Sequence, residues 1–217
     1  MRCEIAGATR PAGGAGAVNE DAFLTGTAPF PWGAVADGAG RAGGSARRAL
    51  DLFRRLLVAT PVDSLADPAT WAAFAGPLDS HLIGLEETTF LAAGLVGDRF
   101  LGVWCGDSRA YRLGPAGEAA LVTAGSRGAR LGSGRARGSP FTAPAAPGMC
   151  LLLLTDGAWT PFELPARLQA VVAALPATRP ADLPDALLTA AARTGHADDM
   201  TAVAFHLRDK SAPIPFL

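Results

Sequence analysis

The sequence lacks the long apolar segments that membrane and exported proteins carry. An apolar run such as Cys150–Leu154 has the length of a strand and falls far short of the ~20 residues that span a bilayer. The segment Met1–Ile5 leads directly into small residues, without the apolar centre of a signal peptide. We therefore expect a cytoplasmic protein that does not act at a membrane.

Cysteine is scarce as well. The chain has 3 cysteines, Cys3, Cys105 and Cys150, which are scattered along its length. An odd number without metal-ligand spacing excludes both a disulfide framework and a cysteine zinc site. The thiols are expected to be buried or incidental side chains in a reducing compartment.

An excess of basic charge is also missing. Lys and Arg number 19 against 20 Asp and Glu, which leaves a formal net charge of -1. Nucleic-acid binding needs a clear basic excess, so nucleic acid is excluded as the main partner. The 217 residues, 49% of them hydrophobic, suit one globular domain, which we expect to act as a monomer.

Helical spacing of apolar residues appears in separate blocks of the chain. Ser45 is expected to cap a helix over 46–58. A second helix is expected to begin at Asp67–Pro68, and Pro77 should interrupt or kink it. Two further amphipathic helices are expected around 165–175 and 183–193.

Short apolar runs between turn residues predict strands in the rest of the chain. They are expected over 22–24, 32–36, 90–96, 100–105, 110–113, 120–122, 149–154 and 200–207. The segment 126–140 is rich in glycine and arginine and is expected to be a mobile loop. Because hairpins join the strands and the helices stand apart, the pattern predicts an α+β fold with antiparallel sheets.

Aspartates stand at the ends of several predicted strands. Asp37 and Asp156 follow apolar runs and precede glycine, Asp107 follows the run 103–106, and Asp198 precedes the last strand. Strand ends meet at a sheet edge, and several carboxylates in one cleft cannot all ionise without a cation. Mg²⁺ and Mn²⁺ prefer such oxygen ligands. The alternative is that each aspartate only forms a turn, since Asp-Gly is a common turn sequence.

Five short segments follow one another along the chain: 19–22 (Asn-Glu-Asp-Ala), 35–40 (Val-Ala-Asp-Gly-Ala-Gly), 106–111 (Gly-Asp-Ser-Arg-Ala-Tyr), 153–157 (Leu-Leu-Thr-Asp-Gly) and 198–203 (Asp-Asp-Met-Thr-Ala-Val). In this order they resemble the motifs of the metal-dependent serine/threonine protein phosphatases of type 2C, in particular their small bacterial members. The resemblance implies a four-layer α-β-β-α sandwich, two antiparallel sheets flanked by helices. It also implies that 1–217 form a single catalytic domain with a shortened flap at about 124–147.

The resemblance further implies a metal site with assigned ligands. Asp37 would bridge two Mn²⁺ or Mg²⁺ ions, and the Gly38 carbonyl would contact the second ion. Asp156 and Asp198 would hold the first ion. The implied catalytic residues are therefore Asp37, Asp156 and Asp198.

Other acids take supporting roles by the same resemblance. Glu20 would reach the second ion through water, Asp21 would orient bound waters, and Asp107 would help to hold a third, weaker ion. Asp199 stands where the family usually has asparagine. The implied reaction is hydrolysis of phosphoserine or phosphothreonine on proteins by a metal-activated water. The implied partners are a phosphoprotein substrate and a serine/threonine kinase or its target.

The sequence departs from the family pattern where the family binds substrate phosphate. Gly16 stands where the family usually carries arginine, and Arg10 and Arg41 are the candidate replacements. Ala39 stands where members have histidine or methionine, so no histidine is available there as a general acid. The alternative function is therefore a phosphatase-fold domain without turnover that binds phosphoproteins or regulates another protein.

Two other patterns have competing interpretations. The string 38–43 satisfies G-x-G-x-x-G, but Asp37 places a carboxylate where a dinucleotide pyrophosphate would approach. The arginines of the 126–140 loop either bind an acidic or phosphorylated partner or lie in a solvated loop; they are Arg127, Arg130, Arg135 and Arg137. Trp159 is expected to pack in the core, and Arg109 to hold its own turn by hydrogen bonds.

Overall fold

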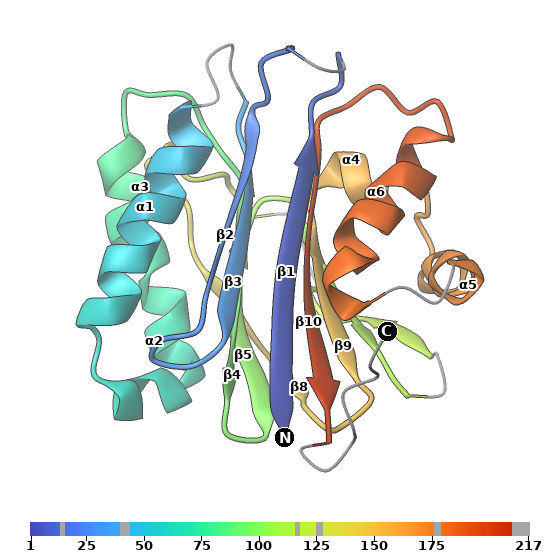
Figure 1. The fold of residues 1–217 in the computed structure, drawn as a ribbon. Helices are drawn as coiled ribbons and strands as arrows, with labels where there is room; N and C mark the ends of the chain where they lie inside the picture. The colour runs from blue at the N-terminus through green and yellow to red at the C-terminus, as the bar shows by residue number, and fades with distance from the viewer. Residues whose placement is uncertain (14–15, 40–43, 116–117, 125–127, 176–178, 210–217) are drawn as a thin grey trace.

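The computed structural model describes residues 1–13, 16–39, 44–115, 118–124, 128–175 and 179–209. Within these ranges the chain forms two five-stranded antiparallel sheets that pack face to face, with helices on both outer faces (Figure 1). The predicted four-layer α-β-β-α sandwich of the α+β class is confirmed. No helix in the described ranges is both long enough and apolar enough to cross a bilayer.

The first sheet joins the two ends of the chain. Its order is β1 (Arg2–Arg10), β10 (Met200–Arg208), β9 (Cys150–Leu154), β6 (Arg109–Leu113) and β7 (Ala119–Leu121). Strands β1 and β10 pair along their whole length, with Arg2 opposite Arg208 and Arg10 opposite Met200. This pairing brings the segment after β1 beside the segment before β10.

The second sheet is built mainly from hairpins. Its order is β2 (Asp21–Gly26), β3 (Trp32–Asp37), β4 (Phe90–Val96), β5 (Arg99–Cys105) and β8 (Ser139–Pro144). In the β2–β3 pair Asp21 lies opposite Asp37, so the start of β2 and the end of β3 share one end of the sheet. Asp21 and Asp37, which belong to different sequence motifs, are therefore neighbours across this pair of strands.

Six α-helices in the described ranges cover the outer faces of the sandwich (Figure 1). The second sheet is covered by α1 (Gly44–Ala59), α2 (Pro68–Ala73) and α3 (Ala75–Leu82), and the first by α4 (Asp156–Trp159), α5 (Pro165–Ala174) and α6 (Leu183–Ala192). Two 3₁₀ turns, Val62–Ala66 and Pro180–Asp182, precede α2 and α6.

Apolar side chains fill three layers, one between the sheets and one under each group of helices. Between the sheets, Phe100 and Phe205 meet edge to face with ring centroids 5.4 Å apart. Under α1, Phe53 is fully buried against the rings of Trp32 and Phe90. Burial of this apolar area is the main force that holds the layers together.

Two strands, β1 and β8, lie where none is predicted. We predict the first strand at 22–24, but β1 precedes it and β2 extends over Asp21–Gly26. Strand β1 has no alternation of apolar and polar residues, and most of its side chains are half-buried. Its conformation comes from pairing with β10, nearly two hundred residues away, which local periodicity does not reveal.

Two further predictions need correction. The break in the second helix falls at Phe74, between α2 and α3, and not at Pro77. Pro77 lies in the first turn of α3, where the missing N–H of proline costs no helical hydrogen bond. The predicted mobile loop at 126–140 includes residues of β8, and its Leu131 pairs with Thr88 in an isolated bridge.

Candidate metal centre

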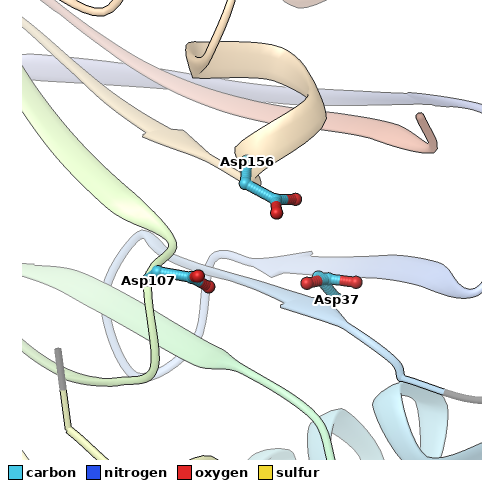
Figure 2. A group of neighbouring side chains, drawn as sticks. All are labelled: Asp37, Asp107 and Asp156. Carbon is cyan, nitrogen blue, oxygen red and sulfur yellow. The ribbon is translucent and has the colours of Figure 1, made fainter. Parts of the chain in front are cut away.

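Three carboxylates come together at one end of the sandwich (Figure 2). Asp37 ends β3, Asp107 follows β5, and Asp156 begins α4 directly after Thr155. Each offers one oxygen, and these oxygens all lie within 4.8 Å of one another. Strand β9, which precedes Asp156, belongs to the first sheet, whereas β3 and β5 belong to the second. The packing of the two sheets thus assembles this group, which we call the acidic cluster.

The glycines after two of these aspartates are required by close backbone contacts. A Cβ on Gly38 would lie 2.9 Å from the carbonyl oxygen of Glu20, whose oxygen accepts a hydrogen bond from the Gly38 N–H at 3.2 Å. A Cβ on Gly157 would overlap the carbonyl oxygen of Asp199. These contacts hold the acidic segments against one another.

Burial and mutual repulsion raise the pKa values of the cluster. The pKa of Asp37 is raised to about 7, first by burial and then by the carboxylate of Asp156. Burial also raises the pKa of Asp156, and the charges of Asp198 and Asp107 add to the shift. The Arg130 guanidinium opposes both shifts and lies 3.4 Å from Asp37 Oδ2 and 3.4 Å from Asp107 Oδ1. Full ionisation of the cluster therefore requires additional positive charge.

Asp21 is a deeply buried acid beside the cluster, with 3% of its surface exposed. Burial raises its pKa to about 8, the charges of Asp37 and Asp199 add to the shift, and hydrogen bonds from Thr155 and Thr201 oppose it. Oδ2 accepts a 2.7 Å hydrogen bond from Thr155 Oγ1. Oδ1 is buried and has no hydrogen-bond partner within the described ranges. A buried carboxylate oxygen of this kind calls for a cation or an ordered water.

Asp199 fixes the segment that carries Glu20 and Asp21. Its Oδ1 accepts a hydrogen bond from the Ala12 N–H at 2.7 Å, and its Oδ2 accepts one from the Glu20 N–H at 2.6 Å. The start of β10 thereby holds the connection between β1 and β2. The sequence pattern indicates no partner for Asp199, because both of its contacts are to backbone groups far away in the chain.

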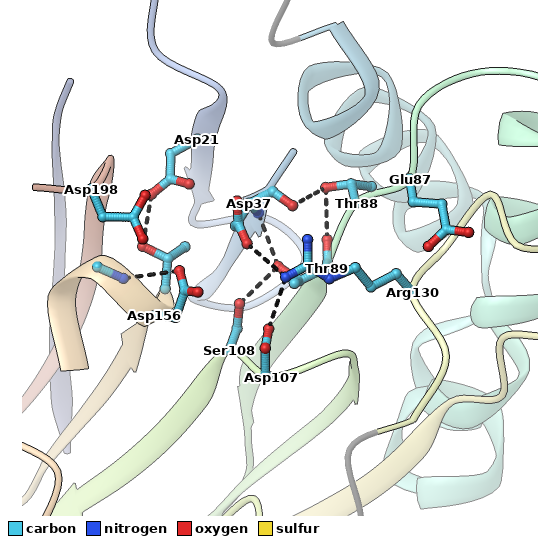
Figure 3. Close-up of polar contacts among 12 residues, drawn as sticks. Asp21, Asp37, Glu87, Thr88, Thr89, Asp107, Ser108, Arg130, Asp156 and Asp198 are labelled. Carbon is cyan, nitrogen blue, oxygen red and sulfur yellow. Dashed lines mark hydrogen bonds and ion pairs between the residues drawn. The ribbon is translucent and has the colours of Figure 1, made fainter. Parts of the chain in front are cut away.

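Asp198 lies at the open side of the site. Figure 3 shows its carboxylate pointing toward Asp21 and Asp156. Half of its side chain is exposed, and His196 Nε2 lies 3.9 Å from its Oδ2. Its charge contributes to the raised pKa of Asp156, although it is not one of the three carboxylates of the acidic cluster.

Trp159, on α4, contacts the backbone of Asp107, and Arg109, on β6, stacks against Trp159. The Trp159 indole N–H donates to the Asp107 carbonyl at 3.1 Å, and its ring is 6% exposed in the core. The Arg109 guanidinium stacks 3.4 Å from the centre of the Trp159 ring and donates to the Tyr111 hydroxyl and the Glu163 carbonyl. Trp159 packs in the core as predicted. The hydrogen bonds of Arg109 go to Tyr111 and to the segment after α4, and not to its own turn as predicted.

Arg10 and Arg41 are the two arginines predicted as candidate ligands of the substrate phosphate. Arg10 donates from Nη2 to Asp185 and Thr189 on α6, each at 2.8 Å, so its guanidinium is directed to that helix. Arg41 lies outside the described residues. Among the described arginines, Arg130 is the one whose guanidinium reaches the acidic cluster. It is one of the four arginines of the predicted 126–140 loop, of which Arg127 lies outside the described residues.

The residues present fit hard divalent cations. Their donors are carboxylate oxygens, half-buried and close together, and one further buried oxygen on Asp21 has no partner in the described part of the chain. Mg²⁺ and Mn²⁺ take such oxygen ligands and would relieve the repulsion that raises the pKa values here. Asp37, Asp107 and Asp156 are the residues whose geometry suits a shared ion.

Solved structures with a similar fold are known, although sequence comparison finds no match. No protein-family model matches the sequence. No curated protein sequence matches it either. Among solved structures, the S. agalactiae serine/threonine phosphatase matches with a TM-score of 0.80 and 17% identity, covering 95% of this chain and 100% of that chain. The Mycobacterium tuberculosis serine/threonine phosphatase PstP matches with a TM-score of 0.76 and 21% identity, covering 96% and 100%.

A third match has the same fold. The catalytic domain of the serine/threonine phosphatase PstP in complex with two manganese ions matches with a TM-score of 0.73 and 22% identity, covering 95% of this chain and 99% of that chain. The likeness extends over almost the whole of both chains. The chain therefore has the fold of the bacterial serine/threonine phosphatases of type 2C.

Proposed function

We propose that this chain is a metal-dependent protein phosphatase that removes phosphate from phosphoserine or phosphothreonine. The observation that carries the proposal is the acidic cluster of Asp37, Asp107 and Asp156 at one end of a type 2C phosphatase fold. The raised pKa of Asp37, about 7, supports a counter-charge at this group of acids. The match to a phosphatase with two manganese ions supports Mn²⁺ or Mg²⁺ as that charge.

The proposed ligands divide between the two sheets. Asp37 would hold the ions with help from the Gly38 carbonyl, and Asp156 and Asp198 would be ligands of the first ion. The chemistry that the cations supply is Lewis-acid activation of a water and neutralisation of charge on the phosphoryl group. The carboxylates bind and space the ions, and the buried surroundings strengthen these electrostatic interactions.

The remaining acids support that site. We assign Glu20 to the second ion through water, Asp21 to the orientation of waters, and Asp107 to a third ion. Asp21 suits this role because its Oδ1 is buried and no described group bonds to it. We take residues 1–217 as one catalytic domain that acts on a phosphoprotein substrate, such as the target of a serine/threonine kinase.

The test is phosphate release from a phosphothreonine peptide, with Mn²⁺, with a chelator, and with the Asp156→Ala variant. We expect release that requires Mn²⁺ and falls by more than about 100-fold in Asp156→Ala, since groups that merely support metal ligands already contribute 10–100-fold. Asp98→Ala is the matched control, because Asp98 is an exposed acid in the turn between β4 and β5, and it should keep full activity.

Absence of release from folded, Mn²⁺-binding protein would contradict the phosphatase proposal. It would instead support the regulatory alternative, a phosphatase-fold domain that binds phosphoproteins without turnover. Circular dichroism of each variant separates loss of activity from loss of fold.

A further inference from the structure

Arg130 stands at the acidic cluster although it comes from a loop rather than from a motif. Its Nη2 lies 3.4 Å from Asp37 Oδ2 and 3.4 Å from Asp107 Oδ1, and its side chain is 28% exposed (Figure 3). Within the described ranges, these two ion pairs are the arginine contacts to the cluster. Arg130 therefore supplies positive charge at the point where the two sheets present their acids.

The backbone next to Arg130 is tied to the strand that carries Asp37. Leu131 and Thr88 form a two-way bridge, with N–H to carbonyl distances of 2.9 and 3.0 Å. The Thr88 hydroxyl then donates to the Asp37 carbonyl at 2.9 Å. This chain of bonds sets the distance between the Arg130 backbone and the cluster.

A buried carboxylate on α3 holds the rest of this loop. Asp79 is 5% exposed, and its Oδ1 accepts hydrogen bonds from the Gly132 N–H at 2.7 Å and the Gly134 N–H at 3.2 Å. Its Oδ2 accepts one from the Ala136 N–H at 3.1 Å. Three backbone donors satisfy a buried charge in the way that such charges require. Gly132 and Gly134 have positive φ angles of 93° and 71°, a conformation that glycine adopts without strain.

A phosphate monoester that approaches the cluster meets carboxylates of its own sign, and a guanidinium beside them favours its approach. The other arginine considered above, Arg10, is engaged with Asp185 and Thr189. A guanidinium presents five donors in a planar fork that matches phosphate oxygens. The position of Arg130 suits this task, because it touches two cluster carboxylates and remains partly open to solvent.

We propose that Arg130 binds the phosphoryl group of the substrate and that Asp79, through the 130–136 loop, is the residue that positions it. The proposal rests on the proposed phosphatase function. The competing role is that of a counter-ion, in which Arg130 neutralises the acids and never contacts substrate.

The first experiment is calorimetric titration of inorganic phosphate into Mg²⁺-saturated protein, comparing wild type with Arg130→Ala and Arg130→Lys. We expect Arg130→Ala to weaken phosphate binding by about 10-fold or more, the size of a lost charge-assisted pair. The phosphate affinity of Arg130→Lys should lie between those of wild type and Arg130→Ala, because lysine keeps the positive charge but lacks the planar fork of donors. Arg137→Ala is the matched control, because Arg137 is exposed in the same region of the chain. The Arg137→Ala protein should bind phosphate with the affinity of the wild type.

Kinetics with a phosphothreonine peptide give the second readout. Arg130→Ala should raise KM by a similar factor with a smaller change in kcat. Unchanged phosphate affinity and KM in Arg130→Ala, together with altered Mg²⁺ affinity, would overturn the proposal in favour of the counter-ion role. Phosphate binding that needs Arg130 in a protein without turnover would instead refute the phosphatase function and leave the Arg130 assignment standing.

The positioning role of Asp79 is tested by a double-mutant cycle. Asp79→Asn keeps an acceptor for Gly132 and Gly134 but turns an amide N–H₂ toward the Ala136 N–H. We expect weaker phosphate binding in Asp79→Asn and no further loss when Arg130→Ala is added. Additive losses would show that Asp79 acts independently of Arg130. If Asp79→Asn does not fold, Gly134→Ala, strained at a φ of 71°, perturbs the same loop.

Discussion

The metal-free protein should lose stability as the pH rises through neutrality. In the folded state, burial holds the pKa of Asp21 at about 8 and that of Asp37 at about 7, both above the ordinary value of 3.8. Between pH 4 and 8 the folded protein therefore binds more protons than the unfolded chain. Stability that depends on these retained protons is present at low pH and is lost as the pH approaches the folded pKa values.

The structure sets the size of this effect. One retained proton changes the free energy of unfolding by about 1.4 kcal/mol per pH unit. Between pH 6.0 and 7.5 one such proton corresponds to about 2 kcal/mol. For a domain of this length, 2 kcal/mol shifts the melting temperature by about 4–8 °C. Asp21 and Asp37 repel each other, so the protonation of one depends on the charge of the other. Their contributions to the free energy of unfolding are therefore not added together.

The assay is thermal unfolding in chelator at a series of pH values. Asp21→Asn should be more stable than wild type at pH 7.5 and should show a shallower dependence on pH, because asparagine carries no proton to lose. Asp51→Asn, on the exposed face of α1, is the control and should follow wild type. With saturating Mn²⁺ the trend should reverse, since protons compete with the metal for the carboxylates. Stability in chelator that stays flat or rises from pH 6.0 to 7.5 would refute the reasoning.

Two substitutions test the backbone contacts around the site. Gly157→Ala should destabilise the protein by about 1–3 kcal/mol in denaturant unfolding and weaken Mn²⁺ binding, because the new Cβ overlaps the Asp199 carbonyl. Gly76→Ala is the control. A Cβ at this position in α3 has open space around it, so the substitution should stabilise the protein by up to about 1 kcal/mol. Asp199→Asn should cost about 1–3 kcal/mol, because both Asp199 oxygens accept backbone N–H groups, from Ala12 and Glu20, and asparagine has only one acceptor oxygen. Unfolding curves equal to wild type would contradict either assignment.

Elements with strong local patterns are predicted well from the sequence. The hairpin of β4 and β5 is expected within one residue of its observed bounds, because apolar runs flank a glycine turn. Asp67 is expected as a helix cap, and its carboxylate accepts the Ala69 N–H at 2.9 Å. Strand β9 is visible because a run of leucines is buried on both faces. In each case the physical cause lies within a few residues of the element.

The position of the acids at strand ends is also a property of the sequence. Asp37 and Asp156 each follow an apolar run and precede a glycine, and the structure brings both into the acidic cluster with Asp107. Their convergence follows from burying the strands, because the ends of packed strands meet at a common edge. The ligand roles assigned to them remain predictions for metal-binding experiments.

What only the tertiary structure decides is where groups without a local pattern are placed. Strand β1 exists because β10 pairs with it, and Asp199 meets the Glu20 N–H from the far end of the chain. Arg130 contacts Asp37 and Asp107, and Asp79, some fifty residues earlier on α3, accepts N–H groups of the residues that follow Arg130. These contacts join segments far apart in the chain and form only when the sheets and α3 are packed together, so local sequence patterns do not reveal them.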